Sequence, residues 1–151
     1  LCDIEQGRLN MTTTAAGSVV IDDTYNSNPS SLAYSLELLA NLPWKGRRVA
    51  VLGDMLELGE HSEDEHFWIG RNFVLDKCDL LVTLGKEAHN ISEGALDSGM
   101  ESDMVLHFDN ISLMKRRAQT IFLPGDLILV KGSRGMKMER IVEMLLTGGR
   151  I

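Results

Sequence analysis

The stretch VVIDDTYNSNPSSLAYSLELL, residues 19 to 39, decides the fold, because an apolar strand is followed at once by a well-signalled helix. The apolar run 19–21 ends at two aspartates. Asn28 is a typical N-cap residue, and Pro29 suits the first helical position. Three leucines then recur at spacings that place them on one helix face, namely Leu32, Leu36 and Leu39. The stretch predicts a strand, a polar loop and an amphipathic helix.

The same alternation of apolar runs and amphipathic segments continues along the chain. Buried strands are predicted over Arg48 to Leu52, Asp79 to Leu84, Met104 to Phe108 and Leu127 to Val130. Helices are predicted from Ser62, with Glu65 as its capping-box partner, to about Asp76, then from Ala88 to Asp97, and then after Asn110. A closing helix carries Met138, Ile141, Val142 and Leu145 on one face, with Gly148-Gly149 past its end.

A hairpin is predicted at the start, because Arg8 to Thr14 and Ser18 to Asp22 alternate around Ala16-Gly17. Apolar strands separated by helices imply a mostly parallel sheet covered on both faces. The predicted fold is therefore α/β: a single Rossmann-like three-layer domain over residues 1–151, with a mostly parallel sheet and an N-terminal antiparallel hairpin strand. Ligands of such sheets bind beyond the carboxyl ends of the strands.

Composition restricts the partners. The 151 residues carry a net charge of -7, which opposes nucleic acid and anionic lipid, so we expect neither as a partner. No apolar stretch is long enough to span a membrane, and we expect a soluble, cytoplasmic monomer. Cys2 and Cys78 lack metal or redox spacing and are interpreted as free thiols. The chain opens at Leu1 without a methionine, so we expect it to be part of a longer protein.

The phosphate-binding motifs G-x-G-x-x-G and G-x-x-x-x-G-K-[ST] are both absent. Gly85-Lys86 and the segment 132–135 are superficially similar to them and lack the remaining positions. We therefore expect that this chain alone does not hydrolyse ATP. A nicotinamide-dependent dehydrogenase of the same fold is disfavoured for the same reason, since it requires the first motif.

The loop 22–29 places two carboxylates, the ring of Tyr25 and the amides of Asn26 and Asn28 at a strand end. Such a loop could stack a purine and hydrogen-bond its ribose. The alternative is that Asn28 only caps the helix and the aspartates are solvated turn residues.

Two further strand ends carry polar groups. Asp54 could accept a hydrogen bond from a sugar hydroxyl or a lysine, although the residues that follow it could simply cover a helix end. The loop 131–136 sets two cations, a hydroxyl and two glycines before a helix N-terminus, where a carboxylate or phosphate would bind. Its alternative is a tight turn whose cations balance an acidic domain.

The histidines do not indicate a metal site. His61 and His66 are five residues apart and point to different helix faces, and the acidic residues between them suit the positive end of a helix. His89 and His107 are interpreted as isolated half-buried or surface residues.

Three motifs in succession carry a family resemblance: DDTYNSNP (22–29), VLGDMLELG (51–59) with Ser62 and His66 after it, and KGSRGMKME (131–139). In order, spacing and strand-end placement the chain resembles the C-terminal domain of the Mur ligase family, in the branch that adds D-Ala-D-Ala. The match runs from Gly7-Arg8 to the closing helix. One departure is Ser27, where the family commonly has alanine.

The resemblance implies a domain that closes over a central ATPase domain. By the same resemblance, the central ATPase domain and an N-terminal UDP-binding domain are absent from this chain. The whole enzyme would use ATP with Mg²⁺, the metal being held mainly by the central domain. ATP would phosphorylate the carboxylate of UDP-N-acetylmuramoyl-tripeptide, and the amine of D-Ala-D-Ala would then attack. The products would be the pentapeptide, ADP and phosphate.

Residue by residue, the resemblance assigns a nucleotide site to Tyr25, Asn26, Asn28, Pro29 and Asp54. It assigns the incoming substrate to Gly85, Lys86, Lys131, Ser133 and Arg134. It implies no catalytic or metal-binding residue in this chain. A second hypothesis is a stand-alone module that binds a nucleotide or dipeptide without catalysis, which a P-loop encoded upstream would exclude.

Overall fold

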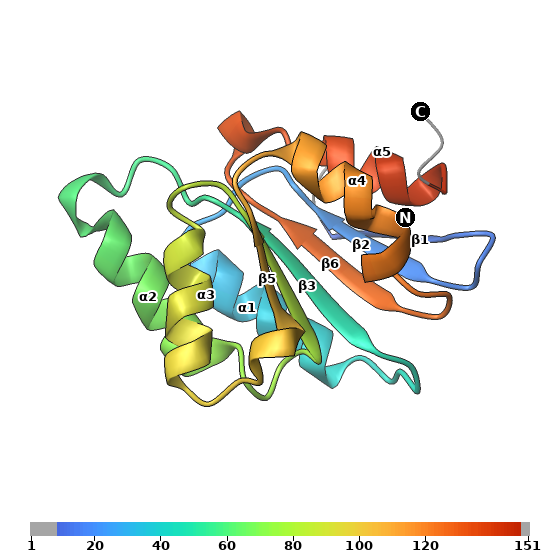
Figure 1. Ribbon diagram of the computed structural model, residues 1–151, viewed down its shortest axis with the longest axis horizontal. Helices are drawn as coiled ribbons and strands as arrows, with labels where there is room; N and C mark the ends of the chain where they lie inside the picture. Colours follow the sequence, from blue (N-terminus) through green and yellow to red (C-terminus); the bar gives the residue numbers. More distant parts are fainter. Residues whose placement is uncertain (1–8, 149–151) are drawn as a thin grey trace.

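The computed structural model describes residues 9–148, which form one six-stranded sheet between two layers of helices (Figure 1). In spatial order the strands are β1 (Asn10–Thr13), β2 (Val19–Asp23), β6 (Leu127–Lys131), β3 (Arg48–Gly53), β4 (Leu80–Leu84) and β5 (Val105–Phe108). β1 and β2 are antiparallel, and every other neighbouring pair is parallel. The predicted α/β fold, with its N-terminal hairpin strand, is confirmed.

The helices divide between the two faces of the sheet (Figure 1). One face carries α1 (Pro29–Asn41), α2 (Ser62–Phe73) and α3 (His89–Asp97), and the other carries α4 (Ile111–Ile121) and α5 (Glu139–Leu146). Short 3-10 turns, η1 (Gly59–His61), η2 (Ser102–Met104) and η3 (Arg134–Met136), lie in the connections. None of the helices within residues 9–148 is long and apolar enough to cross a membrane.

The central strands are buried on both faces, which explains their continuous apolar sequences. In β2, Ile21 packs towards α1 while its neighbour Val20 packs towards α5. Leu129 and Val130 of β6 divide in the same way. Full burial of a side chain of this size contributes about 1.5–3 kcal/mol, so both layers stabilise the sheet.

Two glycines bring α2 and α3 into backbone contact. A Cβ at Gly70 would collide with the carbonyl group of Ile91, and one at Gly94 would collide with the carbonyl oxygen of Phe67. Neither helix could approach the other so closely with a larger side chain at these positions. The two helices therefore pack as one unit against the face of the sheet that also carries α1.

The start of α1 agrees with the sequence analysis. Asn28 is the N-cap, its Oδ1 accepts from the Ser31 N–H at 2.9 Å, and the Ser31 hydroxyl accepts from the Asn28 N–H at 3.1 Å. Pro29 is the first helical residue.

The start of α2 differs from the prediction. The Ser62–Glu65 capping box is absent, because the Ser62 hydroxyl instead donates to Glu87 Oε2 at 2.7 Å. The helix also ends at Phe73 rather than near Asp76. Cys78 is a buried free thiol, as expected. The interpretations that concern Cys2, Gly7, Arg8 and Gly149 lie outside the described residues.

Candidate functional site

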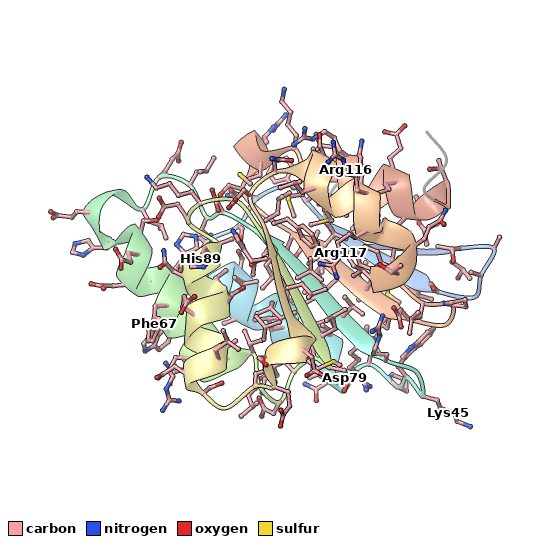
Figure 2. All side chains as sticks on the ribbon, viewed as in Figure 1. Lys45, Phe67, Asp79, His89, Arg116 and Arg117 are labelled. Atoms are coloured by element: carbon pink, nitrogen blue, oxygen red, sulfur yellow. The ribbon has the colours of Figure 1, made fainter. Side chains whose placement is uncertain are left out.

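The sheet reverses its winding at β6. The loop after β2 leads to α1 on one face, whereas the loop after β6 leads to α5 on the other, and β6 lies between β2 and β3. The loops after β2, β6 and β3 therefore meet at the carboxyl edge of the sheet. Lys45 and Asp79, which precede β3 and β4, lie at the opposite edge (Figure 2). Open parallel sheets bind ligands at such a reversal.

A hollow of about 340 Å³ opens where these three loops meet. Its lining comes from the β2 loop, the β3 loop and the β6 loop: Tyr25, Asn26, Leu56, Glu57, Ser133, Arg134 and Gly135. We call it the switch-point hollow. A second hollow, of about 310 Å³, is lined by Phe122, Leu123 and other residues of which none is ionisable. Charged side chains line only the switch-point hollow of these two, so it is the candidate site.

Tyr25 and Arg134 meet at the switch-point hollow. The guanidinium carbon of Arg134 lies 5.2 Å from the centre of the Tyr25 ring, which is a cation–π contact. Arg134 is exposed and Tyr25 is half-buried. A planar aromatic ring and a forked cation thus lie side by side, and these groups suit a flat base and a carboxylate respectively.

Lys131 lies beneath the β2 loop. Its side chain is 3% exposed, and its Nζ is 2.9 Å from Asp23 Oδ2 and donates to the Asn26 carbonyl oxygen at 2.9 Å. The Ser35 hydroxyl donates to the same Asp23 oxygen at 2.5 Å. The predicted cation is therefore engaged in holding the loop that carries Tyr25 and Asn26.

Ser133 joins all three loops. Its Oγ accepts from the Leu56 N–H at 2.7 Å and donates to the Ser27 carbonyl oxygen at 3.3 Å. Its own N–H donates to the Asp54 carbonyl oxygen at 2.9 Å. The Ser27 hydroxyl is buried and has no hydrogen-bond partner among the described residues.

Asp54 turns its carboxylate away from the switch-point hollow. Its Oδ1 accepts from the Ala88 N–H at 2.6 Å, at the start of α3. A Cβ on Gly85, whose φ is 109°, would lie 2.5 Å from the same oxygen, so glycine is required there. Burial raises the pKa of Asp54, and the hydrogen bond from Ala88 opposes this shift.

His66 fixes the residue after Asp54. Its ring is fully buried, its Nε2 accepts from the Met55 N–H at 2.9 Å, and its Nδ1 is 2.6 Å from the Ser62 carbonyl oxygen. Consecutive residues 54–56 are thus each held by a partner from another segment.

Four of the predicted site residues line the switch-point hollow: Tyr25, Asn26, Ser133 and Arg134. Asn28 and Pro29 form the start of α1, Lys131 lies underneath, and Asp54 and Gly85 contact each other. Lys86 is exposed and is not part of the lining. The sequence analysis missed Leu56, Glu57 and Gly135 as lining residues. The positive φ of Glu57, 68°, is a tight-turn signal that its residue type does not reveal.

The interpretation of His89 and His107 as isolated was wrong. Their rings pack edge to face with centroids 4.8 Å apart, and His107 also contacts Thr83 Oγ1 at 2.8 Å. Figure 2 shows His89 at the start of α3. Burial lowers the pKa of His107. His61 is exposed, and within residues 9–148 no cluster of three or more potential ligands could hold a metal ion.

These features define a class: a Rossmann-like α/β domain with a polar ligand hollow at the reversal of its sheet. Residues 7–134 match the family profile described as Mur ligase, glutamate ligase domain. The chain belongs to the Mur ligase family and corresponds to the C-terminal domain of its members.

Its relatives agree with this assignment. The chain is 40% identical, over 92% of its length, to a UDP-N-acetylmuramoyl-tripeptide--D-alanyl-D-alanine ligase of Bacillus subtilis, and 34% identical, over 95%, to that of Escherichia coli. It spans 30% of the length of each. A crystal structure of MurF from Acinetobacter baumannii matches 95% of the chain and 31% of its own, with a TM-score of 0.79 and 33% identity.

A MurF ligase of Thermotoga maritima, solved in complex with ADP, is similar over 96% of this chain and 31% of its own length. Its TM-score is 0.75 and its identity 30%. These two solved relatives thus share the fold of this chain.

Proposed function

We propose that this chain is the C-terminal domain of an ATP-dependent ligase that joins D-Ala-D-Ala to UDP-N-acetylmuramoyl-tripeptide during peptidoglycan synthesis. The observation that carries the proposal is the convergence of all three family motifs on one hollow. Tyr25 and Asn26 come from the first, Leu56 and Glu57 from the second, and the segment 133–135 from the third. The curated relatives of this activity match nearly the whole chain.

The groups at the hollow suit the base and ribose of a nucleotide and the carboxylate of a dipeptide. The Tyr25 ring can stack a base, and Asn26 is exposed beside it to hydrogen-bond a ring edge or ribose. Asn28, Pro29 and Asp54 would contribute by shaping the nucleotide side. The Thermotoga relative was solved in complex with ADP, which supports nucleotide binding by the whole ligase.

For the incoming dipeptide, Arg134 offers the fork that a carboxylate accepts, and Ser133 stands beside it. Lys131 would act indirectly, because the β2 loop that it holds carries Tyr25 and Asn26. Gly85 and the exposed Lys86 would define the neighbouring rim on the dipeptide side. Attack by the dipeptide amine on the activated tripeptide carboxyl would form the amide bond. The role of this domain is to position both reactants as it closes.

The remaining parts of the reaction are assigned to segments outside this chain. We propose that central ATPase and UDP-binding domains supply the phosphate loop and hold Mg²⁺, since the chain lacks a phosphate-binding motif and the described residues lack a metal cluster. Residues 1–151 then form one domain of a monomeric, cytoplasmic enzyme. Its net charge of -7 argues against nucleic acid and membrane partners.

The test is a reconstituted reaction with the whole ligase that contains this chain. UDP-N-acetylmuramoyl-tripeptide, ATP, Mg²⁺ and D-Ala-D-Ala should give the pentapeptide by mass spectrometry, with one ADP released per amide bond formed. Replacing the dipeptide by D-glutamate or L-alanine should abolish the product. Turnover with a single amino acid, and none with the dipeptide, would assign the chain to another branch of the family.

The 151-residue chain by itself should release no phosphate from ATP. Phosphate release that survives purification and disappears with one substitution in this chain would contradict the division of labour between the domains.

A further inference from the structure

We infer that His66 is a positioning residue for the switch-point hollow, where its neutral ring, protonated on Nδ1, holds the β3 loop in place. The inference deepens the proposed function, because this loop supplies Leu56 and Glu57 to the lining. His66 itself does not line the hollow and is fully buried.

The hydrogen bonds determine the tautomer. The Met55 N–H can only donate, so His66 Nε2, at 2.9 Å, must carry a lone pair. The Ser62 carbonyl oxygen can only accept, so Nδ1, at 2.6 Å, must carry the proton. A protonated ring would place an N–H against the Met55 N–H in a buried site, and the other neutral tautomer would break both contacts.

The consequence for the loop follows from its neighbours. The Asp54 side chain is held by Ala88, and the Leu56 N–H donates to Ser133 Oγ at 2.7 Å. Met55 is the link between them, and among the described residues its backbone N–H donates to His66 alone. A lost contact at Met55 would free the backbone just before the lining residues Leu56 and Glu57. Glu57 has a positive φ of 68°.

Ser62 connects the same ring to the next loop. Its hydroxyl donates to Glu87 Oε2 at 2.7 Å, one residue before Ala88, and it also lies 3.3 Å from His66 Nδ1. The β3 loop, the start of α2 and the β4 loop are therefore joined through one imidazole and one hydroxyl. This network accounts for Ser62 and His66 in the second family motif, where a helix cap does not.

The first measurement is the tautomer. Two-bond ¹H–¹⁵N correlation spectra of the 151-residue chain should show His66 Nε2 unprotonated and Nδ1 protonated at neutral pH. A ring protonated on Nε2 would overturn the inference.

The second measurement is amide hydrogen exchange in two variants. Glutamine can place its carboxamide oxygen near the position of Nε2, whereas asparagine reaches only as far as Nδ1. In His66→Asn the protection of the Met55 amide should fall at least about tenfold relative to Val82 in β4, and His66→Gln should retain most of it. The exposed His61 supplies the control, His61→Gln, which should change neither amide. Equal losses at Met55 and Val82 in both variants would show a role in global stability alone and would overturn the inference.

The third measurement links the loop to the site. In the whole ligase, His66→Asn should raise the KM for ATP or for D-Ala-D-Ala at least about threefold, with a smaller change in kcat, and His66→Gln should raise it less. Unchanged constants in His66→Asn would overturn the role at the hollow. If the wild-type ligase does not use D-Ala-D-Ala, the proposed function fails while the tautomer and exchange results stand separately.

Discussion

Lys131→Met should show that the buried cation stabilises the loop over the site rather than the ligand. The substitution keeps the length and apolar stem of the side chain and removes the charge that faces Asp23, whose side chain is 10% exposed. Removing one partner of a buried ion pair costs about 3–5 kcal/mol, because the other charge remains buried. The Ser35 hydroxyl still donates to Asp23, so we expect about 3 kcal/mol.

The assay is urea denaturation of the 151-residue chain. With a typical slope of about 2 kcal/mol/M, the midpoint should fall by about 1.5 M. Adding Asp23→Asn to Lys131→Met removes the stranded charge and should recover about 2 kcal/mol of that loss. The control is Lys77→Met. The Lys77 side chain is 14% exposed, but its carboxylate partners Glu37 and Asp76 are 52% and 76% exposed, so no charge is left buried and the loss should be about 0–1 kcal/mol. A Lys131→Met variant as stable as the wild type, or a double variant no better than the single one, would refute the reasoning.

Three further predictions follow from caps, burial and the forked cation. Asn28→Ala and the matched cap variant Asn110→Ala should each lose about 1 kcal/mol by urea denaturation, and only Asn28→Ala should raise the KM for ATP in the whole ligase; equal KM values would leave Asn28 as a cap alone. Burial raises the pKa of Cys78 to about 12, so the unfolded chain ionises first and stability should fall as the pH rises from about 8.5 towards 12. In a Cys78→Ala variant the urea midpoint should fall less steeply with pH over this range. The same pH dependence in the variant and the wild type would contradict the attribution to Cys78. Arg134→Lys should raise the KM for D-Ala-D-Ala more than that for ATP, since lysine keeps the charge and loses the fork; an unchanged dipeptide constant would remove Arg134 from the site.

Much of the fold was predictable because its strands are buried on both faces. The run 127–130 is entirely apolar, and the N-caps Asn28 and Asn110 mark their helices by local chemistry. The start of α2 was not predictable in the same way. Ser62 has the right residue type for a local cap, but its hydroxyl is engaged by Glu87, 25 residues away, which only the packed structure brings near.

The sequence predicts which loops form the candidate site, but it does not predict which of their residues contact one another. The strand-end rule identifies the polar loops, and it does not say which of them meet, because that depends on the strand order. With β6 between β2 and β3, Tyr25 meets Arg134, whereas Asp54 turns to Gly85 and Ala88 at the next loop. Lining residues such as Leu56 carry no chemical signal of their own in the sequence.

The position of β6 also constrains how the chain can fold during synthesis. Among the strands of residues 9–148, β6 is the last in sequence, yet it pairs with both β2 and β3, which are joined earlier by α1. Until it is made, those two strands lack a pairing partner on the edges that face each other. The pairing with β2 joins Val19 to Leu127, and the pairing with β3 joins Arg48 to Leu127. Such long-range closure is slow and leaves the nascent chain open to aggregation. A chain that ends before residue 127 would lack both the strand that joins β2 to β3 and the segment 133–135 of the hollow.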